Sequence, residues 1–494
     1  MALVATVSMT LVGCAGDEGA STATPPTAPR SEPSTTESTT VAVPSTSLEP
    51  TTTRAIEGVA GADGVGDDLF PLAGNGGYDV ESYELTMSWD PTTSVLDATT
   101  HIVATATENL NSFNLDLRGF EVSAVDVNGA PTEVTRNGQE LVVDIGTVVA
   151  AGAPLDVAVQ YSGVPELVID PDGAQDGWIP TSKGIVAMSE PQGSPTWFPV
   201  NDHPTDKATF SLSMTVPSDL VVVSNGVPEP PVIEGELTTY VWHESHLMAP
   251  YLATVAIGPF TMTTTTTASG LPVISAVQRG LEEASAPTMA RIPEMIDWLS
   301  ETLGPYPFDS VGAIVVDAPD VGFAGLETQG RPVLTVVPSD DLMIHELSHQ
   351  WFGDSVSVAS WNEIWLNEGF ASYIEALWFA HDGVITADQV YNSNSYPPPE
   401  DPFWSKPPGP DTLTDPADLF GAPVYARGAM TLHALRLEVG DDTFFEILRT
   451  WVADHADGNV TTVQFIALAE DISGQQLDEL FTAWLSTPGR PELG

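Results

Sequence analysis

Residues 345–353 read HELSHQWFG, and this stretch decides how the second half of the chain is interpreted. It opens with His345-Glu346-Leu347-Ser348-His349, an HExxH pattern. On a helix, positions i and i+4 project from one face, so both imidazoles can reach one ion. Glu346 stands beside the first of them, where it can take a proton from a water on that ion. The alternative is a surface helix with two unrelated histidines.

A third ligand is needed, because catalytic zinc usually takes three protein ligands and leaves one position to water. Glu368 lies nineteen residues after His349, in the string WLNEGFA at residues 365–371. A second helix packed antiparallel on the first could bring its carboxylate to the ion. Imidazole and carboxylate donors suit zinc, although cobalt or manganese could use the same ligands. We expect one zinc ion, held by His345, His349 and Glu368.

Two kinds of hydrophobic pattern divide the chain. From residue 78 to about residue 260 the sequence alternates as strands do, for example at 83–89 and 100–107, with turn pairs such as Asn128-Gly129 between the runs. Beyond about residue 265 a small mixed part leads into successive helical patterns. We therefore predict an antiparallel β domain at 69–264 and an α+β domain at 265–494. The predicted helices are 284–303, 340–352, 367–381, 422–439, 441–456, 462–473 and 477–485.

The charge balance is strongly acidic. The 494 residues include 14 basic and 68 acidic side chains, which gives a formal net charge of −54. Such a surface repels nucleic acid and anionic lipid, so neither is expected as a partner. The acidity either keeps the protein soluble in salty water or reflects a compositional bias of the whole lineage.

The only cysteine, Cys14, excludes a disulfide scaffold and a thiolate-rich zinc site. Residues 2–12 form an apolar run too short to span a bilayer but suited to a signal peptide. Leu11-Val12-Gly13-Cys14 resembles the bacterial lipobox, in which the cysteine is lipidated, although no basic residue precedes the run. We predict a signal peptide at 1–13 and a lipid anchor on Cys14. The protein would then lie on the outer face of the cell membrane, or be secreted. The alternative is an apolar tail with a chance cysteine.

The segment after Cys14 is dominated by Ser, Thr, Pro and Ala up to residue 54. A segment with so few large apolar residues cannot bury a core. We predict a disordered stalk over residues 14–68, which would hold a folded part away from a membrane.

Together, HELSHQWFG and WLNEGFA resemble the aminopeptidase N family of gluzincin metallopeptidases, in which HExxH is followed by eighteen residues and a glutamate. The resemblance implies a saddle-like N-terminal β domain and a thermolysin-like catalytic domain. It also implies hydrolysis of N-terminal residues from peptides with a free N-terminus, with Glu346 as the general base. It covers about residues 78–491 and omits the long C-terminal helical domain of the larger members, which leaves the depth of the site open.

Further strings carry this resemblance and imply site residues. AGLET, residues 324–328, resembles the family's G-A-M-E-N loop, which implies that Glu327 binds the substrate α-ammonium and that Gly325 lies against the substrate. Leu326 and Thr328 replace the methionine and asparagine of that loop, so the first residue of the substrate would be seated differently.

Two more positions follow from the same resemblance. FPVNDHP, residues 198–204, resembles the family's F-P-x-x-D-E-P segment, and Glu190, eight residues before it, stands where the family often has a second acidic contact to the ammonium. Tyr425, in VYARGA, stands where the family has the tyrosine that stabilises the oxyanion.

Two other functions are open. A zinc endopeptidase could use the same ligands, and a surface-binding lipoprotein could keep the fold without activity. No sequence feature predicts the preferred first residue or the oligomeric state.

Overall fold

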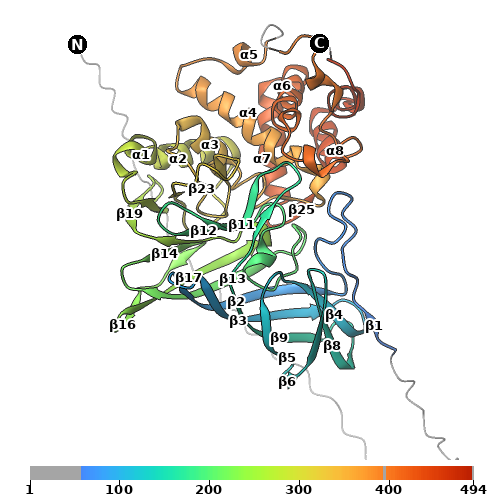
Figure 1. Cartoon of the computed structure of the whole chain (residues 1–494). Coiled ribbons are helices and arrows are strands. Elements are labelled where there is room, and N and C mark those ends of the chain that lie inside the picture. The colour runs from blue at the N-terminus through green and yellow to red at the C-terminus, as the bar shows by residue number, and fades with distance from the viewer. Residues whose placement is uncertain (1–56, 393–395, 492–494) are drawn as a thin grey trace, which may run out of the picture. The chain divides into compact units, whose positions relative to one another are not determined.

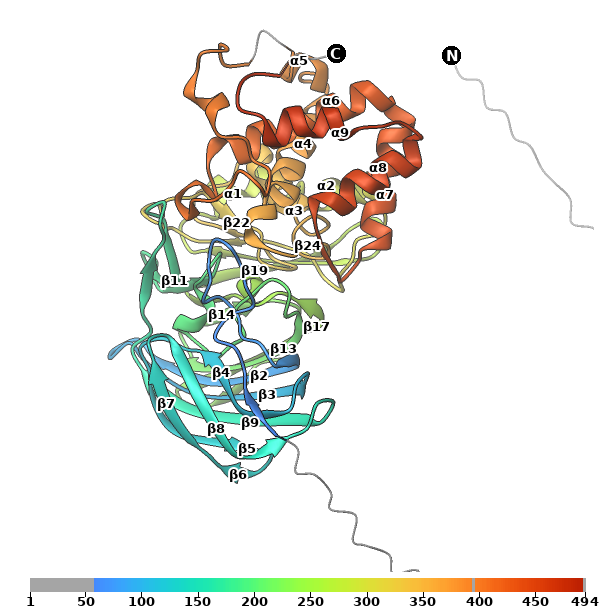
Figure 2. The same ribbon diagram turned by 90° about the vertical axis from the view of Figure 1, so that its right-hand side faces the viewer.

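The computed structural model describes residues 57–392 and 396–491. In Figures 1 and 2 the strands of the first half gather at one end of this part of the chain and the helices of the second half at the other. The predicted signal peptide (1–13), the lipidation site Cys14 and the predicted stalk as far as residue 56 lie outside the described residues. No helix within the described ranges is long and apolar enough to cross a membrane.

A nine-stranded sheet forms the base of the first half, in the order β15-β17-β13-β2-β3-β9-β5-β6 with β16 beside β17. Its long strands alternate buried and exposed side chains, because one face covers the core; in β2, Tyr83, Leu85 and Met87 point inward. The strands are β2 (Tyr78–Asp90), β3 (Val95–Ala106), β5 (Glu121–Val127), β6 (Ala130–Pro131), β9 (Pro154–Gly163), β13 (Ala208–Pro217), β15 (Val227–Pro228), β16 (Val232–Glu234) and β17 (Leu237–Met248).

Two smaller sheets complete the β domain. One has the order β1-β4-β8-β7, the other β10-β11-β12-β18-β14. The second carries Glu190 just past the end of β12 and so leads into the site described below. The strands are β1 (Val59–Ala60), β4 (Leu110–Asp116), β7 (Glu133–Asn137), β8 (Glu140–Val149), β10 (Leu167–Ile169), β11 (Gln175–Pro180), β12 (Ile185–Met188), β14 (Val221–Ser224) and β18 (Val255–Gly258).

The predicted β domain is confirmed, with one correction to its strand directions. β13 runs parallel to β2, and β1 runs parallel to β4, whereas the other pairs within these three sheets are antiparallel. Parallel neighbours need a long crossover instead of a hairpin, and residues 91–207 provide one between β2 and β13. Alternation along each strand is the same in both directions, so it could not distinguish them.

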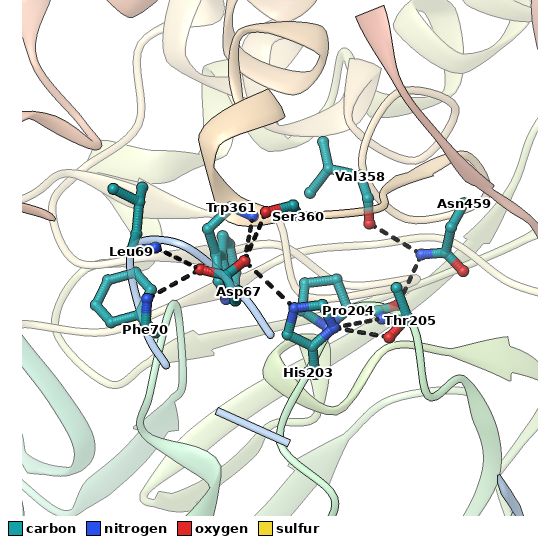
Figure 3. A network of polar contacts seen from close by, with 10 residues as sticks. All are labelled: Asp67, Leu69, Phe70, His203, Pro204, Thr205, Val358, Ser360, Trp361 and Asn459. Atoms are coloured by element: carbon teal, nitrogen blue, oxygen red, sulfur yellow. Dashed lines mark hydrogen bonds and ion pairs between the residues drawn. The ribbon is translucent and has the colours of Figure 1, made fainter. Parts of the chain in front are cut away.

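The stalk prediction is wrong for residues 57–68. Val59 pairs with Leu110 in β4, and Asp67 is buried. Figure 3 shows the Asp67 carboxylate accepting hydrogen bonds from the backbone of Leu69 and Phe70 and from Ser360 and Trp361, residues far away in sequence. Backbone pairing and one buried carboxylate fix this segment, although it has few apolar residues.

A second five-stranded sheet, β19-β20-β21-β23-β22, opens the catalytic half. Because β19 pairs along its whole length with β20, the change of domain falls between Gly258 and Phe260, a few residues before the predicted boundary at 264. The strands are β19 (Phe260–Thr266), β20 (Pro272–Gln278), β21 (Ile314–Val315), β22 (Gly325–Leu326) and β23 (Val333–Leu334), and a small pair, β24 (Ser357–Val358) and β25 (Asn459–Val460), lies further on.

Helices make up most of the remainder, in agreement with the predicted α+β architecture. α4 is buried along most of its length, with an aromatic core that includes Trp365, Phe370 and Trp378. The helices are α1 (Glu282–Met289), α2 (Ile292–Leu303), α3 (Asp340–Ser348), α4 (Trp365–His381), α5 (Ala387–Val390), α6 (Gly428–Val439), α7 (Asp441–Asp454), α8 (Thr462–Ser473) and α9 (Asp478–Phe481).

Candidate metal centre and its cavity

Helices α3 and α4 bring His345, His349 and Glu368 together, as their spacing predicts. His349 caps the end of α3 with helical backbone angles, so the i, i+4 relation to His345 is kept. Oε2 of Glu368 lies 3.2 Å from Nε2 of His345 and 3.5 Å from Nε2 of His349. Ligands at 2.0–2.1 Å from a tetrahedral zinc ion stand roughly 3.3 Å apart, so this donor set fits zinc.

Both histidines are oriented by a partner on the other ring nitrogen. Nδ1 of His345 lies 2.7 Å from Oε1 of Glu375, and Nδ1 of His349 lies 3.0 Å from the carbonyl oxygen of Phe352. Such partners hold the ring so that Nε2 faces the metal. Sequence reasoning missed Glu375, although a signal existed: it lies seven residues after Glu368, two turns along the same face of α4.

The Glu346 carboxylate lies in the same cavity and is buried. Burial raises its pKa to about 8, and a divalent cation at the triad would lower it again. Gly325 makes room for this side chain, because a Cβ atom at that position would lie 2.2 Å from Oε1 of Glu346. The structure therefore places Gly325 directly against Glu346.

Two more carboxylates converge here, Glu190 from the end of β12 and Glu327 from the loop after β22. One carboxylate oxygen from each lies within 4.8 Å of one from Glu368 and of the other. Oε1 of both Glu190 and Glu327 is buried and has no hydrogen-bond partner within the part of the chain that the structure describes. Burial, and then the charge of Glu327, raises the pKa of Glu190 well above its usual value. Two neighbouring buried carboxylates with unpaired oxygens favour the binding of a cation between them.

Tyr425 reaches the centre from a π-helical turn, Pro423–Arg427, just before α6. Its ring lies 6.0 Å from that of His345, centroid to centroid. The approach depends on two glycines where α4 and α6 meet: a Cβ on Gly369 would lie 2.9 Å from Gly428. Helices that pack this closely bring the turn before α6 next to the metal ligands.

A cavity of about 630 Å³ encloses these groups. Its other walls come from the hairpin between β10 and β11, from the loop that precedes β22 and from the start of α3. All eight site residues predicted within the described ranges line it: Glu190, Gly325, Glu327, His345, Glu346, His349, Glu368 and Tyr425. The ninth prediction, Cys14, lies outside those ranges.

Comparison with known proteins agrees with this architecture. The sequence profile of the Peptidase M1 N-terminal domain matches residues 79–252, and that of the Peptidase family M1 domain matches residues 291–484. Aminopeptidase M1 of Arabidopsis thaliana is 27% identical over 329 residues, which cover 62% of this chain and 37% of that protein. Aminopeptidase N of Streptomyces lividans is 26% identical over 326 residues, covering 59% of this chain and 37% of that protein. The chain thus spans less than half the length of these curated relatives.

Solved structures match almost end to end. The M1 zinc metallopeptidase from Deinococcus radiodurans is 29% identical, with a TM-score of 0.79 over 87% of this chain and 98% of that one. A mutant of that enzyme bound to a Tyr-Ser-Ala substrate matches with 28% identity and a TM-score of 0.78 over 87% of this chain and 99% of that one. This chain matches the M1 peptidases in both sequence profiles, in the β domain, in the catalytic fold and in the ligand set for one zinc ion. The chain therefore belongs to peptidase family M1, as an aminopeptidase N-type gluzincin.

Proposed function

We propose that the protein is a zinc-dependent aminopeptidase that removes the first residue from peptides. The observation that carries this proposal is the pair of buried carboxylates, Glu190 and Glu327, each with an oxygen that has no partner among the described residues. They lie beside the triad in one cavity. A peptide α-ammonium would supply the missing positive charge and donors, and would fix the scissile bond at the first residue.

His345, His349 and Glu368 would hold the zinc ion. When bound, zinc polarises the scissile carbonyl and lowers the pKa of its water. Glu346 accepts the proton of the attacking water on its carboxylate and passes it to the leaving amine. Gly325 leaves the space in which that carboxylate turns from one partner to the other.

Tyr425 is suited to the oxyanion. The Tyr425 ring lies nearly parallel to the ring of His345. Burial raises the pKa of the Tyr425 hydroxyl well above 10, so this hydroxyl stays protonated and can donate a hydrogen bond. A donor that meets the charge only as it develops lowers the barrier more than it strengthens substrate binding.

Aminoacyl-fluorophore substrates test this function. The purified protein should hydrolyse them, lose activity with a chelator and regain it with zinc. Glu346→Gln should reduce kcat by at least about 100-fold while zinc content stays that of the wild type, because the ligands are unchanged. Full activity in this variant would show that Glu346 is not the base.

The lipobox-like string adds a proposal about location. A lipid on Cys14 would tether the enzyme to the outer face of the membrane through the Ser/Thr/Pro-rich segment, so that it acts on external peptides. Mass spectrometry of the mature N-terminus tests this. A lipid-modified Cys14 supports it, and an unmodified N-terminus upstream of Cys14 contradicts it.

A further inference from the structure

The hairpin between β10 and β11 contributes a carboxylate, Asp170, to the cavity. The proposed chemistry does not use this carboxylate. Asp170 follows the last residue of β10 and lines the same cavity as Glu190 and Glu327. It is 8% exposed, and its Oδ1 is buried with no hydrogen-bond partner in the described part of the chain. Leaving a buried carboxylate oxygen unpaired is costly, so Asp170 is a candidate for binding a ligand.

Strand directions place Asp170 beside the proposed ammonium site. β10 and β12 both run antiparallel to β11, which lies between them, so they run in the same direction. Asp170 follows β10 and Glu190 follows β12, so both leave the sheet at the same edge. Two strand spacings put their backbones roughly 10 Å apart.

The tip of the hairpin is fixed against the catalytic half. The backbone N–H of Gln175 donates to the carbonyl of Val321 at 2.7 Å, and a Cβ on Gly322 would lie 3.1 Å from Cα of Ala174. Val321 and Gly322 lie in the loop that precedes β22, and Glu327 directly follows that strand. These contacts join the hairpin that carries Asp170 to the segment that leads to the proposed ammonium site.

The charges around Asp170 are mostly negative. Burial, followed by the charge of Asp176, raises the pKa of the Asp170 carboxyl to about 8. Arg118 opposes this rise, but its guanidinium donates to Gln139 at 2.8 Å, and the described residues contain no ion pair between Arg118 and Asp170. A cation that enters the cavity would relieve this imbalance.

We propose that Asp170 recognises a positively charged side chain on the first residue of the substrate, lysine or arginine. The inference rests on the proposed aminopeptidase function, because Glu190 and Glu327 must hold the α-ammonium. The long side chain then extends along the sheet edge to Asp170. Phe323 and Phe420 also line the cavity and offer apolar surface to its methylene groups.

Wild-type selectivity provides the first test. Arginyl and citrullinyl substrates with the same fluorophore differ in charge but hardly in shape, and lysyl and norleucyl substrates form a second matched pair. We expect kcat/KM to favour the charged member of each pair by about tenfold to a hundredfold, the range of a charge-assisted hydrogen bond. Equal values for both members would overturn the inference while hydrolysis itself upheld the aminopeptidase function.

Variants of the hairpin provide the second test. Asp170→Asn should remove most of the preference for charge and leave the norleucyl substrate within a few-fold of wild type. Asp170→Glu should retain part of it. Asp320→Asn is the matched control, since Asp320 is exposed, lies next to Val321 and is not part of the cavity lining. An equal loss on charged and neutral substrates would mean that Asp170 acts only in folding, and would contradict the proposal.

Discussion

At the scale of single residues, the centre depends on groups beyond the metal ligands. Gly325 and Glu375 illustrate this, since Gly325 makes room for Glu346, the proposed base, and Glu375 orients the ligand His345. The HExxH pattern and Glu368, nineteen residues after His349, lie close together in sequence on two neighbouring helices. Their spacing alone therefore predicts the three metal ligands. The roles of Gly325 and Glu375 depend on which atoms face them, which spacing does not give.

Gly325→Ala should nearly abolish activity without unfolding the protein. The new Cβ would lie 2.2 Å from Oε1 of Glu346, and the carboxylate would have to move away from the water. A displacement of about 1 Å at a reacting group costs on the order of 100-fold in rate. Hydrolysis of aminoacyl-fluorophores and zinc content should be measured together. Ala324→Gly, which changes the same loop without adding an atom, is the control and should stay within a few-fold of wild type.

Glu375→Gln should weaken zinc binding about 10- to 100-fold, because His345 loses a charged hydrogen-bond partner. At saturating zinc, kcat should fall much less. Competition with a chromogenic chelator measures the affinity. Glu438→Gln, which changes an exposed carboxylate at the end of α6, should leave it unchanged. Unaltered zinc affinity in Glu375→Gln would contradict the orienting role.

At the scale of elements, the close approach of α4 and α6 decides where Tyr425 lies. Gly369→Ala, in the second turn of α4, should destabilise the protein by about 1–3 kcal/mol, because the added Cβ would meet Gly428 at 2.9 Å. Helix propensity alone predicts the opposite sign, a gain of roughly 0.5–1 kcal/mol. The sign of the change in unfolding free energy, measured with urea, therefore distinguishes the two expectations. A more stable variant would mean that the two helices do not touch here.

The Asp67 network joins the start of the described chain to the segment before α4 (Figure 3). Burial alone would raise the pKa of Asp67, but hydrogen bonds, chiefly from His203 and the N–H of Trp361, lower it below its usual value. The folded state thus binds this proton more weakly than the unfolded chain does. The carboxylate contributes its full stability above the unfolded pKa of ~4, and the contribution is lost as pH falls below that value.

Asp67→Asn should therefore cost about 1–3 kcal/mol of stability at neutral pH. The difference from wild type should shrink by roughly 1 kcal/mol at about pH 3. Urea unfolding at both pH values measures this. Asp68→Asn, a change of an exposed neighbour, should show neither effect. A pH-independent difference would mean that the charge of Asp67 is not what stabilises the contact.

Helix ends show where sequence reasoning stops at this scale. The predicted helix 340–352 ends at Ser348 as α3, because the next turn is tighter: the N–H groups of Gln350 and Trp351 reach only three residues back, to Leu347 and Ser348. Gly353 then turns the chain with φ of +132°. The helix 462–473 was predicted to the residue, since Thr461 and Gln464 form a capping box and Gly474 ends it in a left-handed conformation. A helix end set by capping residues can be predicted from the local sequence. A helix end set by a turn with tertiary contacts cannot.

At the scale of the molecule, the site is shared by both halves of the chain. Glu190 and Asp170 come from the β domain, whereas the triad, Glu346 and Tyr425 come from the catalytic half. The hydrophobic periodicity of the sequence predicts each domain separately. It does not predict how strand ends of the β domain meet helices of the catalytic half. This is why the proposed ammonium site followed from the resemblance, whereas the proposed role of Asp170 followed only from the structure.

The proposed aminopeptidase activity requires that Glu190 and Glu327 hold a free α-ammonium, and one comparison of two substrates tests this requirement. A short peptide and its N-acetylated form should be incubated with the enzyme and the products identified by mass spectrometry. We predict release of the first residue from the free peptide, and cleavage of the capped peptide slowed by at least about 100-fold, since its neutral amide leaves two buried carboxylates unpaired. Cleavage of both peptides at similar rates would show that Glu190 and Glu327 do not select a free α-ammonium.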